Sequence, residues 1–252
     1  MSEDSSSIIN SEKYWETRFG TGDWAKFNGD KQSIFFAKIL LDILPIWLVN
    51  EINQQKYSIL DIGCAEGSGT NEFKNKFPNS KVMGIDFSES AIAIARTKYP
   101  YISFKKADLE NIQENVDIAI VSNVLEHLSE PLETIAHLLE GVNRYLIILS
   151  PINDDLHISE HINYFNPSSF PLSVSGFPLL YFAHKDCRPI IPNYWPGEQF
   201  LLVYSKEGYS FANPNISDIS NIKDLVDLAK TYESIRIAQL EEELTSKSSQ
   251  AS

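Results

Sequence analysis

Between Ser58 and Pro151, short apolar runs alternate with amphipathic stretches, and this alternation restricts the fold more than any other feature of the chain. Runs rich in Ile, Val and Leu are typical of parallel strands buried on both faces, and the stretches between them are typical of crossover helices. The pattern therefore predicts an α/β fold. Its strands cover 58–63, 81–87, 102–108, 116–122 and 144–150, and its helices 70–77, 88–99 and 131–142.

After Pro151 the pattern changes, and two further strand-like runs follow at 178–184 and 199–205. A proline-rich connection without a helical pattern joins them, so a right-handed crossover between parallel strands is excluded and an antiparallel pair is favoured. We therefore expect a Rossmann-like, mostly parallel seven-stranded sheet with an antiparallel pair at one edge and helices on both faces.

Helical patterns also flank this region. One covers 12–19, and a second, apolar one begins near Lys31 and ends or kinks near Pro45. A third covers 217–246, but its apolar register drifts. We expect a flexible N-terminus over 1–10, one catalytic domain over 11–212, and a helical extension with a flexible tail over 213–252. This extension could pair with a second copy of the chain or with a protein partner.

Composition restricts the partners and the location. The formal net charge of −13 opposes nucleic acid, which proteins hold mainly with Lys and Arg, and favours a small-molecule or glycan ligand. The first ten residues are acidic and serine-rich and do not resemble a secretory signal. Only two cysteines occur, which suits a reducing compartment, so we expect a cytoplasmic protein. The longest apolar stretch, 34–49, is interrupted by charges and a proline, so we expect no membrane span.

The first predicted strand runs into a loop with small residues at every second position, namely Gly63, Ala65, Gly67 and Gly69. Such a loop lets the backbone pass close beneath a ligand. The spacing does not match the G-x-G-x-x-G pattern of dinucleotide loops. Asp61 and Glu66 would also repel a pyrophosphate, whereas they suit a cationic ligand.

Asp86 closes the second predicted strand, about 20 residues after this loop. At that separation a carboxylate reaches the ribose of a bound adenosine in doubly wound folds, and its two oxygens can accept from both hydroxyls. The alternative is that Asp86 caps the following helix.

Together, LDIGCAEGSG (60–69), GIDFSESAI (84–92), KKADLENI (105–112) and VSNVLEHLSEP (121–131) resemble the motifs of class I S-adenosylmethionine-dependent methyltransferases. Ala65 stands where the usual loop has its middle glycine, a change that still permits close approach. The resemblance extends over roughly 14–205, identifies the 11–212 region as a methyltransferase domain and implies S-adenosylmethionine as the cofactor. By the family pattern, Asp61, Gly63, Ala65 and Gly67 form the cofactor loop, Asp86 holds the ribose, Phe87 packs on the adenine, Asp108 bonds its amino group with Leu109 alongside, and Asn123 lies beneath the methionine moiety.

Two further segments, YWETRF (14–19) and EHINYFNPSSF (160–170), resemble parts of methyltransferases associated with sugar and polysaccharide biosynthesis. By analogy Tyr14 and Arg18 would cover the cofactor, with Arg18 pairing with its carboxylate. The alternative is an amphipathic helix that packs Tyr14 and Trp15 on the core.

Two histidines are candidates for the removal of a proton from an acceptor hydroxyl. His127 follows the fourth predicted strand and His161 follows the fifth, and both strand ends face the crevice of an open α/β sheet. A single histidine is also commonly structural, and proximity of the two substrates alone can suffice for methyl transfer.

The segment 157–161 reads HISEH and formally matches an H-x-x-E-H zinc motif, with Asp154 and Asp155 as further candidate ligands. That motif needs a helix, whereas Pro151 and the Asn-Asp run indicate a loop. We therefore expect no metal from this motif and expect a polar loop that lines the acceptor site.

These observations predict a methyltransferase that acts on oxygen, or alternatively on nitrogen, of a small or sugar-like acceptor. One rival is a non-catalytic scaffold that keeps the fold and acts through its C-terminal helix. The other is a nicotinamide-dependent enzyme, against which the spacing of the loop argues.

Overall fold

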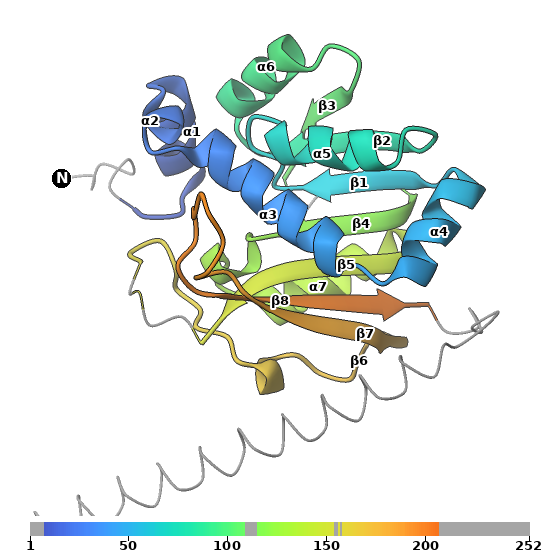
Figure 1. The fold of residues 1–252 in the computed structure, drawn as a ribbon. Coiled ribbons are helices and arrows are strands. Elements are labelled where there is room, and N and C mark those ends of the chain that lie inside the picture. Colours follow the sequence, from blue (N-terminus) through green and yellow to red (C-terminus); the bar gives the residue numbers. More distant parts are fainter. Residues whose placement is uncertain (1–7, 109–114, 154–155, 157, 207–252) are drawn as a thin grey trace, which may run out of the picture.

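The computed structural model describes residues 8–108, 115–153, 156 and 158–206, and it contains an eight-stranded sheet in the order β3-β2-β1-β4-β5-β8-β7-β6 (Figure 1). The strands are β1 (Ser58–Ile62), β2 (Lys81–Asp86), β3 (Ser103–Lys106), β4 (Val116–Ser122), β5 (Val142–Ile152), β6 (Ser173–Val174), β7 (Phe177–Asp186) and β8 (Glu198–Ser205).

The first five strands pair in parallel, and β8 lies antiparallel between β5 and β7. The prediction of a mostly parallel sheet with an antiparallel pair toward one edge is therefore confirmed. The predicted number of seven strands is wrong. The eighth strand, β6, has only two residues, too few to show an alternating pattern, and a tight turn with positive φ at Ser175 and Gly176 joins it to β7.

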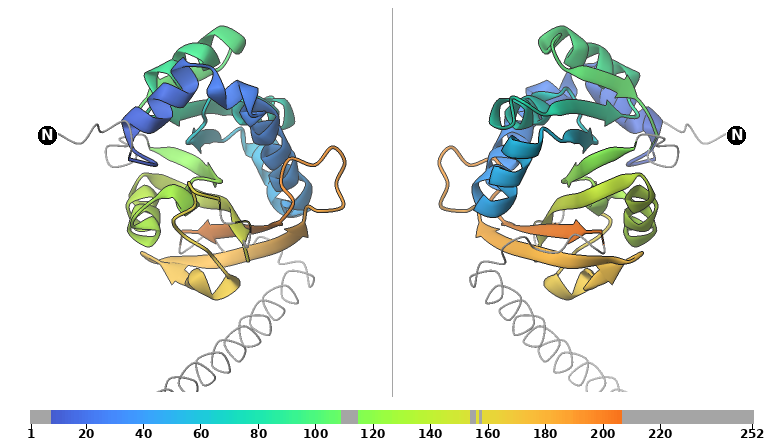
Figure 2. Two further views of the ribbon diagram at one scale, coloured as in Figure 1. Left: turned by 90° about the vertical axis from the view of Figure 1, so that its left-hand side faces the viewer. Right: turned by 90° about the vertical axis from the view of Figure 1, so that its right-hand side faces the viewer.

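Helices cover both faces of the sheet (Figure 2). They begin where the sequence offers caps: the side chain of Ser11 accepts from the amide of Tyr14, Ser88 does the same for Ala91, and Pro131 opens its helix. The helices are α1 (Glu12–Gly20), α2 (Asp23–Lys26), α3 (Gly29–Ile43), α4 (Ile46–Gln55), α5 (Ser68–Lys76), α6 (Glu89–Lys98) and α7 (Pro131–Glu140), with short 3₁₀ segments at η3 (Leu125–His127) and η4 (Pro167–Ser169).

Alternate residues of the central strands face two separate apolar cores. Ile59 of β1 packs with α3, α4 and α5, while its neighbour Leu60 packs on the opposite face with α7. Buried residues follow one another without a break in these strands because both faces of the sheet are covered.

Pro45 separates α3 from α4, as its position in the apolar stretch predicted. Within the described residues, none of the helices is by itself long and apolar enough to cross a membrane. Only α3 and α4 taken together reach that length, and they bend by 102° at the break.

Several predictions lie wholly or partly outside the described residues. They are the flexible N-terminus expected over 1–10, of which only 8–10 are described, the helix expected over 217–246 and the tail expected after it. The described residues between 8 and 206 form the sheet and its covering helices. The carboxyl ends of β1, β2 and β4 meet at one edge of the sheet, where α1 and α2 lie above them (Figure 1). This edge carries the candidate site.

Candidate active site

Two adjoining cavities, of about 230 and 110 Å³, open at the carboxyl edge of the sheet. They share six lining residues, so together they form one elongated site, which we call the edge cavity. Its combined volume is in the range of small-ligand sites. The six shared residues are Trp15, Trp24, Gly63, Ala65, Asn123 and His127.

The glycine loop forms the floor of the edge cavity. Gly63 has a φ of 72°, and a β-carbon there would lie 2.5 Å from a methyl carbon of Val124, so only glycine fits. Ala65 adopts a φ of 48°, which is uncommon for a residue with a side chain. Both residues line both halves of the cavity, and the small side chains leave room for a ligand above the backbone.

Asp86 holds the end of β2 to the loop. One carboxylate oxygen accepts from the amide of Ala65 and the other from the amide of Ser88, each at 2.9 Å. Burial raises the pKa of Asp86 to about 6, although these amides act to lower it. Asp86 also lines the smaller half of the edge cavity, and each of its oxygens keeps a second lone pair for a ligand hydroxyl. The N-cap of α6 is Ser88, so Asp86 does not itself cap the helix but binds the amide of the N-cap residue. The ribose role of Asp86 stays a prediction.

Asp61 lies at the other end of the loop, where it lines the larger half of the cavity. Its carboxylate accepts from the hydroxyl of Thr70 on α5, and burial raises its pKa to about 7. Neither Asp61 nor Asp86 forms an ion pair with a Lys or Arg of the described residues.

The residues present fit S-adenosylmethionine. The smaller half of the cavity offers apolar walls beside the Asp86 carboxylate, as an adenosine requires, and these walls are Ile85, Phe87, Ala107, Val124 and Leu128. The larger half offers the buried Asp61 carboxylate, whose charge a sulfonium and an ammonium group would balance. The same carboxylate would repel the pyrophosphate of a dinucleotide.

Asn123 lies between the two halves of the cavity, directly after β4. Its φ is 54°, and its amide nitrogen donates to the side-chain oxygen of Gln199 on β8 at 3.2 Å. A side chain held in a positive-φ conformation at the end of a central strand is common at ligand sites. Its position agrees with the predicted place beneath the methionine moiety, which stays a prediction.

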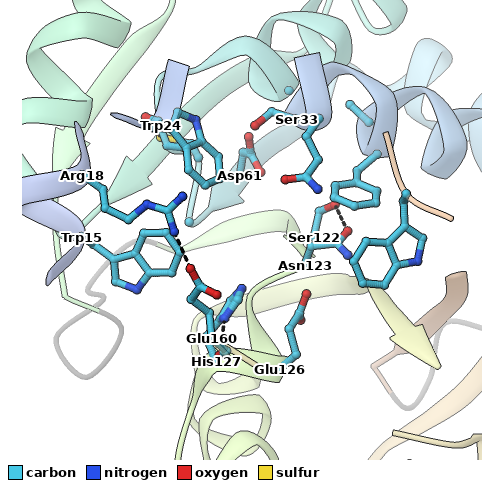
Figure 3. A pocket seen from close by; sticks show the side chains of 18 of the residues that line it. Trp15, Arg18, Trp24, Ser33, Asp61, Ser122, Asn123, Glu126, His127 and Glu160 are labelled. Carbon is cyan, nitrogen blue, oxygen red and sulfur yellow. Dashed lines mark hydrogen bonds and ion pairs between the residues drawn. The ribbon is translucent and has the colours of Figure 1, made fainter. Parts of the chain in front are cut away.

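Arg18 and Tyr14 of α1 both donate to the carboxylate of Glu160. Figure 3 shows the pair of Arg18 and Glu160 at one wall of the cavity. Although burial acts to raise it, the hydrogen bonds from Tyr14 and Ser159 hold the pKa of Glu160 below its ordinary value. Arg18 and Glu160 line the cavity, and Tyr14 stands behind them. Arg18 is therefore next to the site, as predicted, but its partner here is Glu160.

The two candidate bases lie together. The rings of His127 and His161 are 5.1 Å apart, and both residues line the larger half of the cavity. Nδ1 of His127 donates to the carbonyl of Glu160 at 2.9 Å, which leaves the lone pair on Nε2. Burial lowers the pKa of His127 to about 4, so the ring is neutral at pH 7. His161 is buried and stacks on Trp195.

The structure places three of the predicted site residues away from the edge cavity, and a fourth lies outside the described residues. Gly67 does not line the edge cavity, and its glycine is needed because a β-carbon would meet Phe104. Asp108 is exposed and lines a separate hollow beside α7. Glu66 is buried against Lys98, so its charge does not face the cavity. Leu109 lies outside the described residues.

In the described part of the HISEH segment, residues 158–161, the chain forms a loop and not a helix. Residues 158–166 are turn and irregular chain, and the Glu160 carboxylate is bound to Arg18 and Tyr14. Asp154, Asp155 and His157 lie outside the described residues.

Several lining residues escaped the sequence analysis. Gln32, Ser33, Phe36 and Ala37 form one face of α3. Trp24 comes from the short helix α2, Trp195 from a loop and Glu126 from the 3₁₀ segment η3. Phe36 and Ala37 are indistinguishable in the sequence from ordinary core residues of an apolar helix, and the polar Gln32 and Ser33 resemble its solvent face, so only the tertiary packing brings these residues to the cavity. Glu126 directly precedes His127, and that adjacency was the available signal.

Comparisons with known proteins agree with this geometry. Residues 59–146 match the family model of a methyltransferase domain. The trans-aconitate 2-methyltransferase of Escherichia coli is 27% identical over 106 residues, which is 41% of this chain and 42% of that protein. The enzyme of the same name from Deinococcus radiodurans is 26% identical over 137 residues, or 53% of each chain. The aligned part thus spans about half the length of these curated relatives or less.

Two solved structures share the fold. Magnesium protoporphyrin IX methyltransferase from Synechocystis PCC 6803, solved with bound S-adenosylmethionine, superposes with a TM-score of 0.58 at 17% identity, over 81% of this chain and all of that one. A Haloferax volcanii putative methyltransferase, solved in complex with its Trm112 activator, gives a TM-score of 0.60 at 13% identity, over 76% of this chain and 96% of that one.

The strand order, the glycine loop with its two buried carboxylates, and the family match all fall on the same part of the chain. The chain therefore shares the fold of methyltransferases solved with bound S-adenosylmethionine, and its residues 59–146 match the model of a methyltransferase domain.

Proposed function

We propose that this chain is an S-adenosylmethionine-dependent methyltransferase that acts on an oxygen of a small, uncharged, sugar-like acceptor. The observation that carries the proposal is the edge cavity, where Asp86 lines the smaller half, Asp61 lines the larger half, and neither carboxylate pairs with a Lys or Arg of the described residues. We place the acceptor beside His127 and His161, which line the larger half, and call this region the acceptor end. When bound, S-adenosylmethionine supplies an electrophilic methyl group on a sulfonium leaving group.

In this proposal the residues of the chain bind, orient and exclude water. Asp86 accepts from the ribose hydroxyls, Asp61 balances the positive charge of the cofactor, and the backbone at Gly63 and Ala65 lets the cofactor lie against the sheet edge. Trp15 and Trp24 pack edge to face at 5.9 Å and line both halves of the cavity, where they would help to exclude water from the bound substrates. Much of the rate enhancement would then come from holding the acceptor oxygen in line with the methyl group.

His127 and His161 face the acceptor end of the cavity and are the groups available to take the hydroxyl proton. The neutral ring of His127 has its lone pair on Nε2, since Nδ1 donates to a carbonyl. A pKa of about 4 makes it a weak base, so proton removal would be concerted with methyl transfer rather than precede it.

The charges of the cavity wall restrict the acceptor. Among the described lining residues, the only guanidinium belongs to Arg18, which is paired with Glu160, and no lysine is present. Trans-aconitate is a tricarboxylate, and binding it would need several unpaired cations. Trp195, Gln32 and Ser33 instead offer an aromatic surface with polar neighbours, as a neutral hydroxylated ring requires. We therefore propose a different acceptor from that of these relatives.

Calorimetric titration of the full chain with S-adenosylmethionine and with NAD tests the first half of the proposal. We expect saturable binding of S-adenosylmethionine alone. Binding of NAD would favour the nicotinamide rival, and binding of neither would favour the scaffold.

Release of S-adenosylhomocysteine with a panel of acceptors tests the second half. Neutral sugars, nucleotide sugars and trans-aconitate form the panel, and we expect turnover with a neutral hydroxylated compound. Turnover with trans-aconitate alone would contradict the proposed acceptor class and leave the methyltransferase activity standing.

A further inference from the structure

Three side chains that can bind a metal converge on the acceptor end of the edge cavity. Each of Glu126, His127 and His161 offers a ligand atom, and these atoms all lie within 4.8 Å of one another. Glu126 and His127 come from η3 directly after β4, whereas His161 comes from the segment that follows β5. In Figure 3, Glu126 and His127 project from the wall opposite Asp61 and Ser33.

The backbone holds the two segments together at this point. The carbonyl of Glu126 accepts from the amides of Ile162 and Asn163, at 2.9 and 3.1 Å. The Asn163 side chain donates to the carbonyls of Leu125 and Leu128. The three side chains therefore start from fixed positions, and a site of this kind is organised before its ligand arrives.

The surroundings of the two rings also suit metal binding. Histidines that bind metals commonly donate their second ring nitrogen to a carbonyl or carboxylate, which fixes the tautomer. Nδ1 of His127 does this with the carbonyl of Glu160, so Nε2 is the nitrogen that offers a lone pair. The ring of His161 is held by stacking on Trp195, at 5.6 Å and 28°.

We propose that Glu126, His127 and His161 bind one divalent transition-metal cation, such as Zn²⁺, at the acceptor end of the edge cavity. Two imidazoles with one carboxylate favour zinc or its neighbours over Mg²⁺ or Ca²⁺, which prefer oxygen ligands. Ligand atoms that lie about 2.0 to 2.1 Å from a tetrahedral ion are about 3.3 Å from one another. Side-chain rotations that shorten the distances between the three ligand atoms by up to roughly 1.5 Å would therefore form the site.

This site is distinct from the HISEH motif of the sequence. Of that motif only His161 takes part, because Glu160 is bound to Arg18 and Tyr14. Three protein ligands leave a fourth position, and the cavity lies on that side. An acceptor hydroxyl that binds there would be oriented and made more acidic. This last role rests on the proposed function, whereas the metal site itself does not.

Metal binding can be measured without cofactor or acceptor. The full chain, without a histidine tag, is stripped with a chelator and titrated with Zn²⁺ by calorimetry and with Co²⁺ by visible absorption. We expect about one equivalent of either ion to bind with saturation. We also expect Glu126→Gln and His161→Ala to weaken binding by at least about tenfold.

His137→Ala is the matched control, because His137 lies on α7, outside the edge cavity, and should leave metal affinity unchanged. Circular dichroism melts show whether each variant is folded. If the buried Glu126→Gln variant does not fold, His161→Ala alone decides. The proposal is overturned if the chain binds neither ion, or if a folded His161→Ala binds both as the unmodified chain does. Titration of the stripped chain with S-adenosylmethionine reports separately on the proposed function.

Discussion

Arg18 and Glu160 are 142 residues apart in the sequence, yet their ion pair forms one wall of the edge cavity (Figure 3). The pair joins α1 to the segment after β5, and the hydroxyl of Tyr14 donates to the same carboxylate oxygen. The only guanidinium on the described wall is thus held in place by an acid. It can reach the carboxylate of a bound cofactor only by sharing or leaving this partner.

We predict that Arg18→Ala weakens S-adenosylmethionine binding by about tenfold or more. The reason is that a charge-assisted hydrogen bond is worth roughly 1.5 to 3 kcal/mol, and the partly exposed Arg18 should fall at the lower end. Calorimetry measures the dissociation constant. Glu160→Gln is the matched control, since it removes the competing charge and should keep or tighten cofactor binding. Equal affinities of the Arg18→Ala variant and the unmodified chain would limit Arg18 to a structural role with Glu160.

We predict that Asp86→Asn lowers both cofactor affinity and thermal stability. Both carboxylate oxygens of Asp86 accept from backbone amides. In the Asp86→Asn variant one of these oxygens is replaced by an NH₂ group, which cannot accept from the amide it meets. The same change removes a charge-assisted acceptor for the ribose, so the dissociation constant should rise by about tenfold or more.

Asp117→Asn separates the two effects of the Asp86 change. Asp117 accepts from the amide and hydroxyl of Ser58 at the opposite end of β1, far from the edge cavity. It should lower the melting temperature and leave cofactor affinity unchanged. If Asp86→Asn also lowers the melting temperature and leaves cofactor affinity unchanged, Asp86 does not contact the cofactor.

The fold could be predicted because strands buried on both faces produce continuous Ile, Val and Leu runs, as in β1 and β4. A two-residue strand such as β6 has no such signature. Asp86 shows a second limit. The sequence suggested a ribose ligand or a helix cap, and the structure shows that the two carboxylate oxygens hold backbone amides while the residue still lines the cavity.

The site was predictable only where strand ends dictate it. Gly63, Ala65, Asp86 and Asn123 follow strands, and parallel strand ends meet at one edge. Trp24 reaches the cavity from the four-residue helix α2, which is too short for a periodic pattern, and Trp195 reaches it from an irregular segment. The partner of Arg18 was also out of reach, because pairing across 142 residues depends on how α1 docks.

We predict that cofactor affinity increases with pH between about 5 and 7. Burial raises the pKa of Asp61 to about 7 and that of Asp86 to about 6, both from an ordinary 3.8. A carboxyl group whose folded pKa is raised contributes stability below about pH 4, and this contribution is lost as pH rises through the folded pKa. The free protein should therefore lose stability as pH rises from 4 to 7.

A cationic ligand favours the ionised carboxylates, so binding should release protons over this same pH range. Affinity should rise by about tenfold for each pKa unit that the ligand restores, and then level off above pH 7. Calorimetry in buffers of different ionisation enthalpy measures both the affinity and the proton release. Asp61→Asn should flatten the upper part of the curve. A dissociation constant that does not vary from pH 5 to 8 would contradict the assignment of these carboxylates to the cofactor.

We predict that His127→Ala lowers turnover by about a hundredfold or more, measured with an acceptor identified from the panel, because the ring lines the cavity and its Nδ1 donates to a carbonyl, which leaves the lone pair on Nε2. Cofactor affinity should stay within about twofold, and His137→Ala should retain full turnover.

Removal of metal by a chelator then distinguishes two roles of His127, that of a base and that of a metal ligand. If the ring accepts the proton directly, the stripped, unmodified chain keeps its rate. If His127 acts as a metal ligand, stripping lowers that rate to the level of His127→Ala, and added Zn²⁺ restores it only in the unmodified chain. If neither His127→Ala nor His161→Ala slows turnover, orientation of the acceptor alone accounts for the reaction.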